Sequence, residues 1–159
     1  MNQDFVAGRA QPAIVKPRGS NVHAEIGLRY ERRVKRALMK LTNDETTPLI
    51  ELEHNPWFSY AKKDSGLSSV CAPDFLLYHK DNFIIVIEVK LTYVNEAITK
   101  LQGLYCPIVE TALNLPAKPL VITRHLIPSA PKPNAFTLSE AINNPPYLLQ
   151  WLGHGGIIY

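Results

Sequence analysis

The chain has little cysteine, and this argues against two kinds of stabilising site. Its 159 residues include only Cys71 and Cys106. Neither has a Cys or His companion at the spacing of zinc ligands, so no zinc site is expected. In a reducing compartment, where disulfides are rare, we expect both thiols to stay reduced as small, partly buried residues.

Long apolar runs are also absent. No segment approaches the ~18 consecutive apolar residues of a transmembrane helix, so no membrane association is expected. The first five residues, Met-Asn-Gln-Asp-Phe, are polar and acidic and do not resemble a signal peptide. The expected location is therefore the cytoplasm. An apolar fraction of 46% and a charged fraction of 19% are typical of a globular protein, and the length indicates one domain.

Charge is unevenly distributed along the chain. Residues 1–40 contain nine Lys or Arg and three Asp or Glu, whereas residues 41–159 contain eight and eleven. The basic excess therefore accompanies the first predicted helix, and the acidic excess accompanies the candidate metal site described below. This distribution suits a polyanion that binds next to a cation. A solvated helix face is the simpler alternative.

The stretch from Pro73 to Lys90 predicts a β-hairpin that carries chemistry at its open end. Apolar runs at 75–78 and 83–87 flank a polar turn at 80–82, which is a hairpin signal. In an antiparallel hairpin, Asp74 at the start of the first strand lies beside Glu88 at the end of the second. Glu88 and Lys90 share one face because side chains alternate along a strand. Two carboxylates beside an ammonium group suit Mg²⁺ and a water molecule that Lys90 holds or deprotonates. A solvated edge strand is the alternative.

The pair Pro73-Asp74 followed by Glu88-Val89-Lys90 resembles the PD-(D/E)xK nuclease superfamily. The resemblance implies an α/β fold with a restriction-endonuclease-like αβββαβ core, in which helices flank a mixed central sheet. It also implies DNA as substrate and Mg²⁺ as cofactor, with Mn²⁺ as a substitute. Asp74, Glu88 and the backbone carbonyl of Val89 would bind the metal, and cleavage would leave 5′-phosphate and 3′-hydroxyl ends.

A helix is predicted from a cap at Ser20 or Asn21 to about Leu41, because apolar residues recur there at helical spacing. Glu31 lies on the flank of its apolar stripe. The resemblance implies that an acid on this helix helps to orient water or a second ion. The pattern Gly27-x-x-x-Glu31-Arg32 is also similar to the first helix of archaeal-type Holliday-junction resolvases. The alternative role for Glu31 is an i,i+4 ion pair with Lys35.

Residues 49–52 and 57–60 predict one strand that bends at Asn55-Pro56. Its aromatic residues are expected in the core, with base stacking as the alternative. Residues 62–69 predict a polar loop, similar to a Ser-Gly loop that resolvases place before their Pro-Asp pair.

After Lys90 the periodicity predicts a helix over about 96–113, which Pro107 bends. Gln102 and Tyr105 resemble the Gln-and-Tyr helix of lambda-exonuclease-like nucleases. There the Gln helps to hold the catalytic Lys and the phosphate, so Gln102 is a candidate to orient Lys90. Its spacing to Tyr105 is one residue shorter than the usual Gln-x-x-x-Tyr. A surface amide is the alternative for Gln102. Residues 118–126 predict a strand, with Arg124 near its end as a phosphate contact.

These features divide the chain into three parts. Residues 1–21 are predicted to be a flexible basic arm, 22–126 the nuclease core, and 127–159 a Pro-rich extension that packs on the core through a short helix and apolar anchors. The expected function is Mg²⁺-dependent cleavage of DNA. One alternative is a Holliday-junction resolvase, which needs a homodimer to cut two strands symmetrically. Another is a DNA-binding or assembly protein without catalysis. The small size would suit a phage protein.

Overall fold

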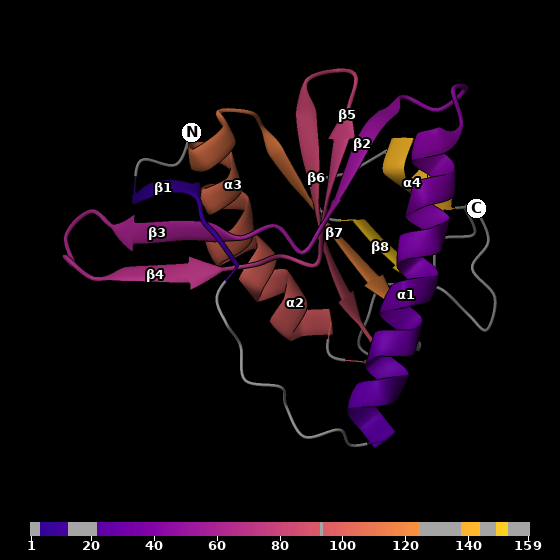
Figure 1. The fold of residues 1–159 in the computed structure, drawn as a ribbon, viewed down its shortest axis with the longest axis horizontal. Helices are drawn as coiled ribbons and strands as arrows, with labels where there is room; N and C mark the ends of the chain where they lie inside the picture. The colour runs from indigo at the N-terminus through magenta and orange to yellow at the C-terminus, as the bar shows by residue number, and fades with distance from the viewer. Residues whose placement is uncertain (1–3, 13–21, 93, 125–137, 144–148, 153–159) are drawn as a thin grey trace.

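The computed structural model describes residues 4–12, 22–92, 94–124, 138–143 and 149–152, which form an α/β fold with two sheets (Figure 1). The elements, in chain order, are β1 (Phe5–Arg9), α1 (Val22–Asn43), β2 (Leu49–His54), β3 (Phe58–Lys62), β4 (Ser68–Cys71), β5 (Phe75–His79), β6 (Phe83–Lys90), α2 (Val94–Lys100), the π-helical turn η1 (Leu101–Tyr105), α3 (Cys106–Leu113), β7 (Ala117–Thr123), α4 (Leu138–Asn143) and β8 (Leu149–Leu152). Within these residues, none of the helices has the length and apolar character needed to cross a membrane.

A mixed five-stranded sheet in the order β2-β5-β6-β7-β8 forms the centre of the molecule. β5 runs antiparallel to its neighbours β2 and β6, whereas β7 runs parallel to β6 and β8 runs parallel to β7. The middle strand, β6, contains four consecutive buried residues from Ile84 to Ile87. Such a run of β-branched residues is typical of a strand that is covered on both faces.

Helices cover both faces of this sheet (Figure 1). α1 and α4 contribute to one apolar cluster, together with the strand residues Phe75, Ile85 and Ile87. α2, η1 and α3 contribute to a second cluster on the opposite face, together with Ile84 and Val86. The two clusters hold β6 rigidly between them, and its last residues emerge at the edge where the candidate site lies.

The predicted hairpin is present as β5 and β6, and Phe75 pairs with Ile87 and His79 with Phe83. Its turn includes Asn82 at φ 62°, a left-handed conformation that Asn tolerates better than most residues. The first predicted helix is also present and buries Tyr30, Val34, Ala37, Leu38 and Leu41. Both cysteines are free and buried, and burial raises the pKa of Cys71 to about 11.

Three sequence-based expectations about the first half of the chain are wrong. Residues 5–9 of the predicted flexible arm form β1, which pairs with β3. The predicted bent strand is two strands in different sheets, because the chain turns between β2 and β3 at Asn55, which has φ 53°. Part of the predicted loop over 62–69 forms β4, which pairs with β3. These strands contain Gly8, Ser68 and Ser69, and their pairing depends on tertiary contacts more than on local propensity.

The helix after β6 begins at Val94 and is interrupted by the π turn η1. In this turn the Cys106 N–H donates to the carbonyl of Leu101, five residues earlier. Pro107 follows directly. It has no N–H for the carbonyl of Gly103, and in an α-helix its ring would clash with that carbonyl. The expected bend at Pro107 therefore takes the form of a widened turn.

The described residues of the C-terminal extension form a helix that contributes to the core and a strand that extends the central sheet. α4 buries Leu138, Ala141 and Ile142 in the same cluster as α1. β8 adds a parallel strand next to β7, where the sequence predicted only apolar anchors. The remaining residues of the proposed extension, and residues 13–21 of the proposed arm, lie outside the described residues.

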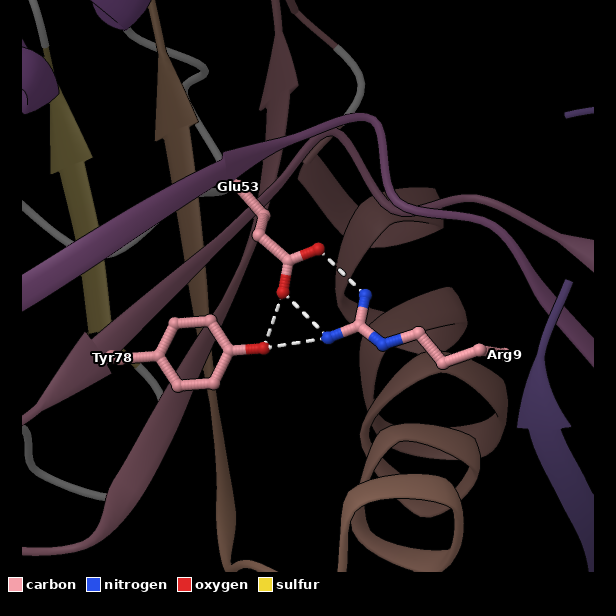
Figure 2. Close-up of polar contacts among 3 residues, drawn as sticks. All are labelled: Arg9, Glu53 and Tyr78. Atoms are coloured by element: carbon pink, nitrogen blue, oxygen red, sulfur yellow. Dashed lines mark hydrogen bonds and ion pairs between the residues drawn. The ribbon is translucent and has the colours of Figure 1, made fainter. Parts of the chain in front are cut away.

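A polar cluster ties the three-stranded sheet β1-β3-β4 to the five-stranded sheet (Figure 2). Arg9 of β1 donates from both terminal nitrogens to the Glu53 carboxylate of β2, at 2.6 Å each. Arg9 also donates to the hydroxyl of Tyr78 on β5 at 2.9 Å, and that hydroxyl donates to Glu53. Phe58 from β3 is fully buried in the second apolar cluster, as expected for a core aromatic residue.

Replacing Arg9 should loosen this connection, because Glu53 would stay largely covered without its cation. We expect Arg9→Ala to lower the free energy of unfolding by about 1 kcal/mol, a modest value because the guanidinium is half exposed. Urea denaturation of Arg9→Ala, Glu53→Gln and the double variant would measure the coupling. Arg36→Ala, on the exposed side of α1, is the control. Additive effects of the two substitutions would contradict a bond between them.

Candidate active site

Asp74 and Glu88 lie side by side at the open end of the β5–β6 hairpin, as the hairpin predicts. Phe75 pairs with Ile87, so Asp74, which precedes Phe75, lies next to Glu88, which follows Ile87. One oxygen of Asp74 accepts a hydrogen bond of 2.7 Å from the Val89 N–H. The side chains of Asp74 and Glu88 are also hydrogen-bonded to each other. The chain before β5 is therefore fixed to the end of β6 at the point where the two carboxyl groups meet.

Glu88 is a buried carboxyl group, only 2% exposed. Burial, followed by the hydrogen bond and the charge of Asp74, raises the pKa of Glu88 to about 8, and the charges of Lys90 and Lys100 oppose this rise. Glu88 therefore releases its proton at a higher pH than an exposed glutamate would. A cation at the same position would favour loss of that proton.

A cleft of about 550 Å³ lies beside these residues. α1 contributes Gly27, Tyr30 and Glu31 to its lining, and the hairpin end contributes Asp74 and Lys90. Glu31 was predicted from the first helix and Asp74 and Lys90 from the hairpin, and these two distant parts of the sequence line one space. The lining is completed by Ala24, Glu25, Leu28, Val89 and Leu91.

Tyr30 brings a buried hydroxyl group to the wall of this cleft. Its side chain is 4% exposed, and the hydroxyl has no hydrogen-bond partner within the described part of the chain. Burial raises the pKa of this hydroxyl well above its ordinary value, and the charge of Arg124 opposes the rise. The backbone N–H of Arg124 donates to the carbonyl of Lys90 at 3.2 Å. Arg124 is thus attached to the end of the strand that carries the site.

Glu31 pairs with a residue that the sequence analysis did not assign to it. Its carboxylate lies 3.0 Å from Nε2 of His54 at the end of β2. The His54 ring stacks on Phe75, with 5.0 Å between ring centroids. The i,i+4 pair with Lys35, the alternative role for Glu31, is not among the ion pairs of the described residues. His54 therefore links Glu31 to the residue that follows Asp74.

Gln102 is exposed on the π turn, and Lys100 and Tyr105 are the side chains of this segment that lie near the carboxyl pair. Lys100 Nζ is 3.8 Å from Oε1 of Glu88 and 5.5 Å from the centroid of the Tyr105 ring. Burial, and then the charge of Glu88, raises the pKa of Tyr105 above its ordinary value. The sequence analysis did not consider Lys100, which is the last residue of α2, directly before the widened turn. In the sequence, Pro107 was the feature that could have indicated a widened turn in this helix.

The donor set fits a hard divalent cation. In residues 4–12, 22–92, 94–124, 138–143 and 149–152, no group of three or more His, Cys, Asp or Glu side chains is arranged to hold a metal. Mg²⁺, however, commonly uses only one or two carboxylates and completes its shell with water and phosphate oxygens. Asp74 and Glu88 supply such a pair, and Glu31 lines the adjoining cleft.

Comparison with known proteins shows a likeness of fold. No protein-family model matches the chain, and no curated protein matches its sequence. A solved structure, protein VC1899 from Vibrio cholerae, is similar with a TM-score of 0.51 and 14% sequence identity. The match covers 82% of this chain and 32% of that one, so the chain spans about a third of the length of the protein it resembles. At this identity the likeness concerns the fold alone.

The raised pKa of Glu88 predicts an unusual dependence of stability on pH. A carboxyl group that binds its proton more tightly in the folded than in the unfolded state stabilises the fold at low pH. This contribution is lost as the pH rises from about 5 through about 8. Denaturant titrations in EDTA should therefore show a fall in unfolding free energy over this range, and Glu88→Gln should reduce the fall. An unchanged profile in Glu88→Gln would contradict the assignment.

Proposed function

We propose that this protein is a Mg²⁺-dependent deoxyribonuclease of the PD-(D/E)xK type. One observation carries the proposal: the buried carboxyl pair of Asp74 and Glu88 meets at the end of β6, and Lys90 follows two residues later on the same strand face. Asp74 and Lys90 open into a cleft that Glu31 also lines. Carboxylates, an ammonium group and space for a phosphate are the components that metal-assisted phosphodiester hydrolysis requires.

The order of elements supports a restriction-endonuclease-like core. α1, β2, the β5–β6 hairpin, α2 and β7 follow one another in the αβββαβ order. In this proposal β1, β3 and β4 are additions that form the second sheet, and α4 and β8 extend the central one.

Each residue then has a chemical role. Asp74, Glu88 and the carbonyl of Val89 would hold Mg²⁺, and Mn²⁺ would substitute for it. When bound, the ion would stabilise negative charge on the phosphoryl and leaving oxygens. Lys90 would position the attacking water or take its proton. Attack in line with the leaving 3′ oxygen would give 5′-phosphate and 3′-hydroxyl ends.

Two further residues have less direct roles. Glu31, held by His54 at the cleft wall, would bind through water or assist a second ion. Gln102 is the residue to which the nuclease resemblance assigns the orientation of Lys90. Its exposed position on η1 gives this assignment no support, so Gln102 is not included in the catalytic set.

The surface next to the cleft suits a polyanion. The first turns of α1 line the cleft, and the same helix exposes the basic residues Arg29, Arg32, Arg33 and Arg36. Such a row would neutralise phosphates of a nucleic-acid backbone without reading its sequence.

Cleavage assays test this function directly. We expect the wild type to cut DNA in Mg²⁺ but not in EDTA, and Lys90→Ala to lower the rate by about 10²–10⁴-fold, the usual contribution of proton transfer by a positioned side chain. Lys80→Ala, at the far end of the hairpin, is a matched control. If no substrate is cut while DNA is still bound, the protein has a binding or assembly role instead.

Metal binding can be measured separately from cleavage. Calorimetric titration with Mg²⁺ or Mn²⁺ should show binding that Asp74→Ala abolishes and that weakens as the pH falls, because Glu88 must release its proton. Asp81→Ala, at the exposed hairpin turn, is the control. Equal affinities for the wild type and Asp74→Ala would place the ion elsewhere.

A structure-selective resolvase is the second candidate. The observation that favours it is that Gly27 and Glu31, which carry the resemblance to the first helix of resolvases, both line the cleft. Supercoiled plasmid, linear duplex and a four-way junction should be offered in the same assay. Preferential, symmetric cutting of the junction by a homodimer would favour this candidate.

A further inference from the structure

A second lysine contacts the buried carboxyl pair, and neither the sequence pattern nor the proposed mechanism gives it a role. Lys100, the last residue of α2, has its ammonium nitrogen 3.8 Å from Oε1 of Glu88. Its side chain is 40% exposed, whereas that of Glu88 is 3% exposed. Lys100 therefore joins the buried carboxyl group to the surface.

The approach of Lys100 differs from that of the cleft residues. α1, which lines the cleft, packs on one face of the central sheet, whereas α2 and η1 pack on the other. Lys100 thus reaches Glu88 from the face opposite α1. A ligand held by Lys100 would contact the site at a different point from one held by Glu31.

The π turn explains why Lys100 meets Tyr105, which lies five residues later in the chain. Side chains five residues apart do not face each other in an α-helix. The wide turn closed by the bond from Cys106 N–H to the Leu101 carbonyl brings Lys100 within 5.5 Å of the Tyr105 ring. Single π turns inside helices often occur at functional sites. The ammonium group of Lys100 thus lies near the buried Tyr105 ring, and the Lys100 side chain stays partly accessible.

The charge of the site indicates what Lys100 would bind. Once Glu88 has released its proton, as metal binding requires, Lys90 and Lys100 balance the charges of Asp74 and Glu88, so these four residues then have no net charge. A divalent cation on the carboxylates would leave them with an excess of two positive charges. The charge of Lys100 would then no longer be required to balance that of Glu88, and binding of an anion beside the metal would be favoured.

We propose that Lys100 is a phosphate-binding residue, which pairs with Glu88 in the metal-free protein and binds a backbone phosphate of the nucleic acid once a divalent cation occupies the two carboxylates. This inference rests on the proposed nuclease function. It adds a contact on the α2 face to those that line the cleft, and it assigns to Lys100 the role in this helix that the resemblance gave to Gln102.

Binding of labelled duplex DNA in Ca²⁺, which is used as a metal that does not support cleavage, tests the proposal. Fluorescence anisotropy at several salt concentrations should show that Lys100→Gln weakens binding about five- to tenfold. It should also reduce the slope of log affinity against log salt by about one, the loss of a single phosphate contact. Lys80→Gln, which removes the same charge at the hairpin turn, should change neither quantity to this extent.

Metal titration without DNA separates phosphate binding from a structural role. Removing an ammonium group beside Glu88 should leave the Mn²⁺ affinity unchanged or raise it, because like charges repel. If Lys100→Gln lowers the affinities for Mn²⁺ and for DNA together, Lys100 only supports Glu88 and the proposal is wrong.

The remaining outcomes distinguish this proposal from the proposed function. Metal-dependent DNA binding by the wild type, with the same affinity and salt slope in Lys100→Gln, would overturn the role of Lys100 and leave the nuclease proposal intact. Loss of affinity in Gln102→Ala, but not in Lys100→Gln, would return the role to Gln102. Absence of DNA binding by the wild type would overturn both proposals.

Discussion

The burial of Glu88 at the end of β6 is the constraint on which the site depends. β6 is covered on both faces by helices, so a polar residue in its sequence is placed in a medium that disfavours charge. The carboxyl group is tolerated there because Asp74 shares its hydrogen bond and Lys100 is close by. An apolar residue at this position would pack more simply. The cost of burying a carboxyl group is therefore a reason to expect a function for it.

The hairpin turns this constraint into a defined geometry. Because β5 and β6 are antiparallel and closely connected, the register that pairs Phe75 with Ile87 also fixes Asp74 beside Glu88. The bond from the Val89 N–H to Asp74 then fixes the carboxyl group in the last position before the strands separate. A shift of one residue would turn Glu88 toward α1 and separate the pair. The apolar residues that determine the register thus also position the chemistry.

The sequence predicted the parts of the fold and the site that follow from local patterns. The continuous apolar run of β6 and the turn at Asn82 led to the hairpin and to Asp74, Glu88 and Lys90. The periodicity of α1 led to the first helix. β1 and β4 were missed, and β3 was assigned to the wrong sheet, because these short, Gly- and Ser-containing strands form through pairing with distant segments. The partner of Glu31 was missed for the same reason, since Glu31 lies on α1 and His54 reaches it from β2, which is distant in the sequence.

The position of Lys100 shows a different limit of sequence reasoning. A helical projection with 3.6 residues per turn places Gln102 and Tyr105 near one another and leaves Lys100 aside. In the structure Lys100, which lies directly before the widened turn, is the side chain of this segment that meets Glu88, and Gln102 is exposed. The presence of Lys100 in place of Gln102 also matters chemically, because the amide of a Gln can hold a neighbour in place but cannot balance charge. With Lys100 beside the pair, the site has two ammonium groups for two carboxylates, and a divalent ion would make it a site for anions. The end of α2 therefore contributes to the electrostatics of the site, although the sequence pattern assigned it no role.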